Sequence, residues 1–206
     1  MRFFRLNLFS LALIFSLAAC SGFGVVSNTD PIDKLNQAES LYIHEDRPLI
    51  AEILIFDAMK IAKERQDLRA LGSSYRQYAD LLRSPAITGK WATHYRKKGF
   101  EDRSITFDTR LEKSNEYYRQ AISYYDQAAK QFTLNNQYDL LTNVDFNTAT
   151  SYSQLGEKLK SCGYFDRALA AHKEHVKRNP EAKQKTGSGN SVSELVAVEK
   201  KKNGCA

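Results

Sequence analysis

Two histidines on one expected helix are the residues best placed to do chemistry. His172 and His175 lie three positions apart, so both side chains could face one metal ion. No third ligand is spaced to join them. The chain also lacks a GxSxG nucleophile motif, a phosphate-binding P-loop and the HExxH zinc signature. We therefore expect no metal site, no cofactor and no catalysis by this chain.

The acidic residues do not supply a recognisable acid–base pair. Glu101, Asp102 and Asp126 are the carboxylates we considered, and their spacing does not bring two of them to one scissile bond. A carboxylate pair brought together only by the fold stays open on the sequence alone.

Composition narrows the class of protein. The chain has 206 residues with 42% hydrophobic and 26% charged residues, which is typical of one folded domain. The formal net charge is +6, but the only dense basic run is Lys200–Lys202. Nucleic-acid binding needs a clustered basic face. We therefore expect no nucleic-acid partner.

The N-terminus carries a residue whose chemistry is modification. Residues 1–5 (MRFFR) are basic, and Leu6–Leu17 is an apolar run of secretory length, too short for a permanent membrane span. Residues 17–20, Leu-Ala-Ala-Cys, resemble the lipobox of bacterial lipoproteins. That resemblance implies that residues 1–19 are a signal peptide and that Cys20 receives lipid chains. Ser21, rather than Asp, implies outer-membrane export. The alternative is an ordinary secretory signal with an incidental cysteine.

Two further cysteines, Cys162 and Cys205, remain after Cys20. Export places them in an oxidising compartment, where they either pair or stay as free thiols. If they pair, the disulfide fixes the tail, residues 181–206, to the last helical hairpin.

Apolar periodicity predicts an all-α protein. A tether is expected over residues 20–30 and a helical domain over 31–180, followed by a tail with a flexible linker and a short helix. Asp30-Pro31 is a helix start signal and Ser84-Pro85 a stop signal. The expected helices are Ile32–His44, a helix that begins at Arg47-Pro48, Asp67–Arg83, Arg110–Phe132, Tyr138–Ser161, Phe165–Arg178 and Val192–Lys202.

The stretch Tyr152–Pro180 resembles a tetratricopeptide repeat. Its Leu155-Gly156 pair, the turn glycine Gly163 and the small Ala168 fall at the offsets of that family. Residues 67–83 and 110–132 resemble the two helices of a second unit. The resemblance implies a right-handed α-solenoid of about three antiparallel helix pairs, with residues 85–109 inserted in the middle unit.

In that family the first helix of each pair lines a groove for extended peptides. Carried onto this chain, the resemblance implies eight groove positions: Arg69, Ser73, Arg76, Gln77, Ser153, Glu157, Lys160 and Ser161. The basic ones would suit a partner that bears carboxylates. The alternative is that they are solvated surface charges.

The insertion is the other candidate for binding. Residues 85–109 contain the only tryptophan of the chain and interleave aromatic and basic side chains. The candidate contact residues are Lys90, Trp91, His94, Tyr95 and Phe100. The alternative is that these rings cover helix ends.

These features predict a lipid-anchored adaptor of the bacterial envelope. We expect an outer-membrane, periplasm-facing protein that binds a partner protein and has no activity of its own. The other reading is an envelope enzyme or a peptidoglycan-binding module that uses Trp91–Phe100.

Overall fold

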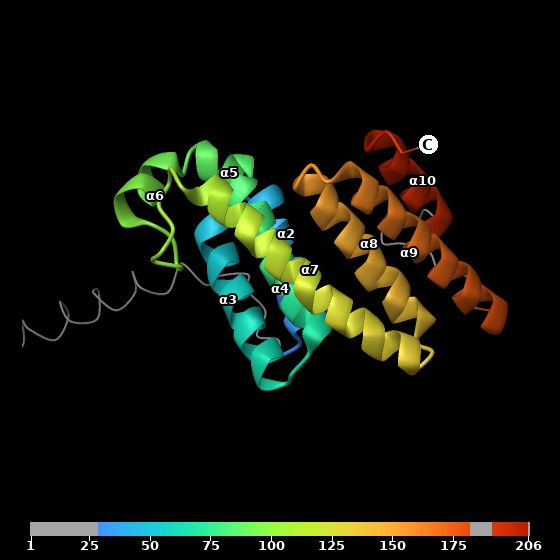
Figure 1. Cartoon of the computed structure of the whole chain (residues 1–206). Helices are drawn as coiled ribbons and strands as arrows, with labels where there is room; N and C mark the ends of the chain where they lie inside the picture. The colour runs from blue at the N-terminus through green and yellow to red at the C-terminus, as the bar shows by residue number, and fades with distance from the viewer. Residues whose placement is uncertain (1–28, 182–190, 206) are drawn as a thin grey trace, which may run out of the picture.

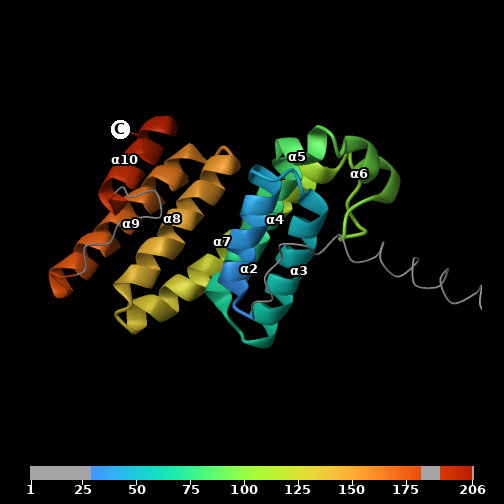
Figure 2. The ribbon, with the colours of Figure 1, turned by 180° about the vertical axis from the view of Figure 1, so that it is seen from behind.

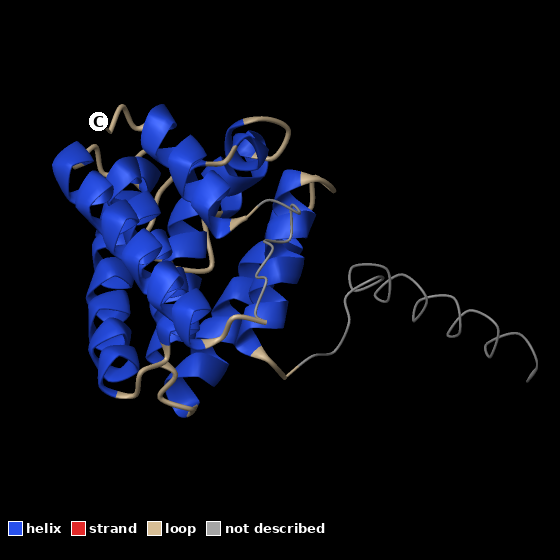
Figure 3. Ribbon diagram, turned by 90° about the vertical axis from the view of Figure 1, so that its right-hand side faces the viewer, coloured by secondary structure: helices blue, strands red, loops and turns tan. Residues whose placement is uncertain are grey.

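The computed structural model describes residues 29–181 and 191–205, and every regular element in these ranges is a helix (Figures 1 and 3). The all-α prediction is therefore confirmed. The helices are α2 (Pro31–Ile43), α3 (Pro48–Glu64), α4 (Leu68–Arg83), α5 (Pro85–Thr88), α6 (Ala92–Lys98), α7 (Arg110–Leu134), α8 (Tyr138–Gln154), α9 (Lys158–Arg178) and α10 (Val192–Lys202). None of these helices combines the length and the apolar character that crossing a membrane requires. The signal peptide, Cys20 and most of the tether lie outside the described residues.

Local signals explain where the early helices begin and end. The Asp30 carboxylate accepts hydrogen bonds from the Ile32 and Asp33 N–H groups at 2.8 and 3.1 Å, and so caps α2. Asp67 caps α4 in the same way, through the Ala70 N–H at 2.9 Å. Ser84 is extended before Pro85 and ends α4.

The long helices pack mostly against their neighbours in the chain. Contacts join α2 to α3, α3 to α4, α4 to α7, α7 to α8 and α8 to α9 (Figures 1 and 2). The insertion, with α5 and α6, lies at one end of α3 and α4. Buried side chains of α2, α3, α4 and the insertion form the largest core cluster. The insertion is therefore part of the fold and not a loose loop.

Helices α4 and α7 cross closely at Gly72 in α4. A Cβ atom added there would lie 2.6 Å from Cδ1 of Tyr125 in α7, inside van der Waals contact. Tyr125 is fully buried, and Tyr118, Ala121 and Ala128 of the same helix are buried beside it. Gly72 is needed because any side chain would collide with the Tyr125 ring.

The expected turn at Gly163 is wrong. The structure ends α8 at Gln154 and begins α9 at Lys158, so Gly163 lies inside α9. Gly156 has a φ of +75° and forms the turn, with no atom within 4 Å of an added Cβ. The Gly156 N–H donates to the Ser153 carbonyl and the Glu157 N–H to the Tyr152 carbonyl, both at 2.9 Å. This Schellman motif needs a left-handed residue, which glycine adopts without strain.

The tail folds back onto the last hairpin. Val196 of α10 is buried against α8 and α9, and Lys200 forms an ion pair with Asp166 at 2.7 Å. Cys162 and Cys205 form a disulfide with an S–S distance of 2.03 Å. The expected turn at Gly163 would have included Cys162. The structure instead places Cys162 inside α9.

Candidate functional site

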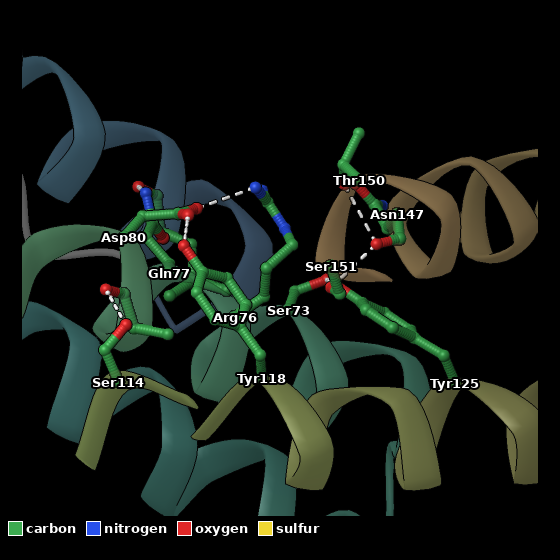
Figure 4. A network of polar contacts seen from close by, with 12 residues as sticks. Ser73, Arg76, Gln77, Asp80, Ser114, Tyr118, Tyr125, Asn147, Thr150 and Ser151 are labelled. Carbon is green, nitrogen blue, oxygen red and sulfur yellow. Dashed lines mark hydrogen bonds and ion pairs between the residues drawn. The ribbon is translucent and has the colours of Figure 1, made fainter. Parts of the chain in front are cut away.

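A polar face runs along α4, a helix that contacts α2, α3, α7 and α8 (Figure 4). Ser73, Arg76 and Asp80 repeat at helical spacing, so their side chains share one side of α4. Arg76 Nη1 lies 2.8 Å from Asp80 Oδ2, and the Tyr118 hydroxyl of α7 donates to Asp80 Oδ1. We call Arg69, Ser73, Arg76 and Asp80 the α4 face.

Two tyrosines of α7, Tyr118 and Tyr125, form hydrogen bonds with side chains of this face. The Tyr125 hydroxyl donates to Ser73 Oγ at 3.1 Å. Burial raises the pKa of Tyr125, and burial together with the Asp80 carboxylate raises the pKa of Tyr118. Both hydroxyls therefore stay protonated at neutral pH. Their hydrogen bonds fix the rotamers of Ser73 and Asp80.

Arg76 is not the open cation that the sequence suggested. Its side chain is 25% exposed and that of Asp80 is 24% exposed, so the ion pair is mostly shielded from water. Asp80 already neutralises the guanidinium, which weakens the case for Arg76 as a receptor for a second carboxylate. The pair instead sets the shape of the α4 face.

Gln77 was expected to line the groove, and the structure contradicts that. Its side chain is 3% exposed, and Nε2 donates to the Leu35 carbonyl of α2 at 2.8 Å. Gln77 therefore joins α2 to α4. Arg69 is partly exposed and forms no hydrogen bond or ion pair within residues 29–181 and 191–205. It is the basic residue of the α4 face whose charge no described residue neutralises.

The insertion residues divide into buried and accessible groups. Tyr95 and Phe100 are each 1% exposed, and their stacked ring centroids lie 4.6 Å apart. Their assignment as partner contacts is wrong, because both rings fill the core beneath the insertion. Trp91 Nε1 donates to the Asp46 carbonyl at 3.0 Å, and Lys90 Nζ lies 3.1 Å from the Asp46 carboxylate.

His94 is partly buried, with its ring centroid 5.9 Å from that of Trp91. The insertion thus covers helix ends, the alternative that its aromatic content had left open. Of the four rings named for the insertion, Trp91 and His94 are partly exposed and Tyr95 and Phe100 are buried.

The expected groove positions of the last unit lie at the turn between α8 and α9. Lys160 Nζ pairs with Glu157 at 2.6 Å, and the Ser153 hydroxyl donates to Asn203 Oδ1 of the tail. Ser161 is buried. These residues hold the turn and the tail, so they do not extend the α4 face.

The two histidines lie on α9. His172 is 8% exposed, and burial together with His175 lowers its pKa. Within the described ranges, no three His, Cys, Asp or Glu side chains are placed to hold a metal ion.

Sequence reasoning missed a hollow between α7 and α9, lined by Asp126, Ala129, Lys130, Thr133, Leu134, Tyr164 and Arg167. The Tyr164 hydroxyl donates to Asp126 at 2.7 Å, and Arg167 lies 2.9 Å from Asp145. Asp145 is 2% exposed, and burial raises its pKa to about 6 against the opposing effect of Arg167. The available signal in the sequence was Asp145, a charged residue among the buried positions of α8.

No protein-family model, curated protein or solved structure matches this chain. The likeness to tetratricopeptide repeats therefore stays an expectation from the sequence.

Proposed function

We propose that this protein is a lipid-anchored scaffold of the bacterial envelope, and that the α4 face receives a segment of a partner protein. The observation that carries the proposal is the asymmetry of α4. Its apolar side is buried against α3 and α7, while Arg69, Ser73, Arg76 and Asp80 lie together on another side. Tyrosine hydroxyls already fix two of these side chains, so little order is lost when a partner binds.

The close crossing at Gly72 supports a repeat-type arrangement of the helices. In the repeat family, the Leu-Gly pair of the first helix faces the second helix of its unit. Here Leu71-Gly72 of α4 faces Tyr125 of α7. We therefore propose a right-handed α-solenoid of tetratricopeptide type with the pairs α2–α3, α4–α7 and α8–α9. The insertion divides the middle pair.

The disulfide supports a location in the cell envelope. Cys162 and Cys205 are bonded, and such bonds persist in exported proteins. Together with the lipobox-like residues 17–20 and with Ser21, this favours outer-membrane anchoring through Cys20, with the helical domain facing the periplasm. Lipid tethering would raise the local concentration of the α4 face near membrane partners.

The test is a crosslinked pull-down from envelopes with a matched pair of charge reversals. Arg69→Glu changes the accessible cation of the α4 face, and Arg119→Glu makes the same change on an exposed residue of α7. We expect one stoichiometric protein partner, lost with Arg69→Glu and kept with Arg119→Glu. Equal recovery from both variants would reject the α4 face as the binding surface.

Membrane anchoring is tested separately by cell fractionation. Cys20→Ala should move the protein from the membrane fraction to the soluble fraction. Full retention on membranes would contradict lipid anchoring through Cys20 while leaving the binding surface to be judged by the pull-down.

A further inference from the structure

One end of the helical bundle carries an excess of positive charge. The insertion, the turn between α8 and α9 and the last turn of α10 lie at this end (Figures 1 and 2). The basic end comprises residues 44–47, 84–109, 155–160 and 199–205, and the opposite end comprises residues 29–34, 64–69, 134–139 and 177–181. The basic end has eleven basic and seven acidic side chains, whereas the opposite end has five basic and six acidic ones. The charge is therefore polarised along the bundle.

Five exposed cations of the basic end form no ion pair within residues 29–181 and 191–205: Lys97, Lys98, Arg103, Lys158 and Lys201. Those on the insertion lie close together, since Arg103 Nη1 donates to the Lys98 carbonyl at 2.9 Å. The other two come together because the disulfide joins the start of α9 to the end of the tail. A Cβ atom added at Gly204 would lie 3.0 Å from Lys158 Nζ. The fold therefore gathers these cations into two groups, one on the insertion and one where α9 meets α10.

Apolar side chains are exposed among these cations. Leu159 is 87% exposed in the first turn of α9, between Lys158 and Lys160. Trp91 of the insertion is partly exposed beside Lys90, whose Nζ lies 5.9 Å from the Trp91 ring centroid. Leucine and tryptophan side chains flanked by lysines are typical of surfaces that bind at a membrane interface.

We propose that the basic end is a membrane-contact surface, at which the free cations bind the phosphates of an anionic bilayer and Leu159 enters the headgroup region. The contact involves neither the α4 face nor Cys20, so it is independent of the proposed function.

A bilayer fits this surface better than an acidic protein segment does. The two groups of cations lie on different parts of the fold, so they match a broad sheet of negative charge. Four of the five cations are lysines, whose compact charges suit phosphates, whereas close recognition of carboxylates favours the planar fork of arginine. A bilayer interface also accommodates an exposed leucine beside lysines, which an acidic segment alone does not.

The insertion holds its cations on a fixed base. Tyr95 and Phe100 are buried beneath them. The Glu101 N–H donates to the carboxylate of Glu52, a buried residue of α3, at 2.8 Å. Little conformational freedom is therefore lost when the basic end meets a charged surface.

Trp91 is the only tryptophan of the chain and reports on the contact. The measurement is energy transfer from Trp91 in the full chain to dansyl-labelled lipid headgroups. It compares vesicles that contain phosphatidylglycerol with vesicles of phosphatidylcholine alone. We expect strong transfer on the anionic vesicles only. The transfer should disappear in about 1 M NaCl, where the Debye length is about 3 Å.

A matched pair of double variants locates the contact. Lys158→Gln with Leu159→Ser changes the basic end. Lys130→Gln with Leu134→Ser changes an exposed lysine and an 82% exposed leucine near the opposite end. Each lysine near an anionic surface strengthens binding about fivefold. We expect the first double variant to weaken the contact by about fivefold or more, and the second to leave it unchanged.

Three results would overturn the proposal. Equal transfer on anionic and zwitterionic vesicles would show that the basic end makes no contact with anionic lipid. Equal loss in the two double variants would show that the contact lies elsewhere. Binding of soluble polyglutamate, abolished by Lys158→Gln with Leu159→Ser and without transfer on anionic vesicles, would assign the surface to an acidic protein instead.

Discussion

Two glycines inside helices allow a direct test of the packing. Gly72 of α4 and Gly163 of α9 both lie in helix interiors, but their surroundings differ. A Cβ at Gly72 would lie 2.6 Å from the Tyr125 ring, and a Cβ at Gly163 would meet no atom within 4 Å. The same substitution, Gly→Ala, should therefore have opposite effects on stability.

The magnitudes follow from two opposing contributions. Alanine is favoured over glycine in a helix interior by about 1 kcal/mol. At Gly163 nothing offsets this gain, so Gly163→Ala should raise the free energy of unfolding by about 1 kcal/mol. At Gly72 the methyl group overpacks a fully buried ring, at a cost of about 1–3 kcal/mol. Gly72→Ala should therefore lose about 1 kcal/mol net, which separates the two variants by about 2 kcal/mol.

Urea unfolding followed by circular dichroism, with the disulfide intact in both variants, measures the difference. Gly163→Ala is the more decisive of the two variants. If Gly163 lay in a left-handed turn, alanine there would destabilise the protein. A loss of stability there would contradict a helical Gly163 and would favour a turn at that residue. A gain from Gly72→Ala as large as that from Gly163→Ala would refute the close crossing of α4 and α7.

Three further changes have defined outcomes. Gly156→Ala should lower the free energy of unfolding by about 1 kcal/mol in urea, because φ is +75°; no change would contradict the turn. Cys162→Ser with Cys205→Ser should cost up to about 4 kcal/mol, and reductant should then have no further effect on thermal unfolding. Asp145→Asn should gain stability relative to the wild type by about 3 kcal/mol between pH 4 and pH 8, since the raised pKa of Asp145 favours the folded state only at low pH; parallel pH curves would reject this.

Most helix boundaries could be predicted because their signals are local. Asp30-Pro31, Asp67 and Ser84-Pro85 are caps or breakers that act within a few residues. The boundary between α8 and α9 was missed because two glycines compete for one turn. The likeness to a repeat favoured Gly163, while the Schellman hydrogen bonds form at Gly156.

The candidate site was less accessible to sequence reasoning, because burial depends on distant partners. The sequence analysis expected three buried residues at the surface. Gln77 is buried because it bonds to a carbonyl of α2, and Tyr95 and Phe100 are buried because they pack in the core beneath the insertion. Glu52 left one signal, a lone carboxylate on the buried stripe of α3. Its Oε1 accepts a hydrogen bond from the N–H of Glu101, far along the chain, which no local pattern reveals.

Photo-crosslinking from the α4 face in intact envelopes tests the central claim most directly. A photoreactive residue would replace Arg69 in one sample and Arg119 of α7 in the control. The scaffold proposal predicts a discrete crosslinked partner from position 69 that is missing from position 119. No partner from position 69, or the same pattern from both positions, would contradict it.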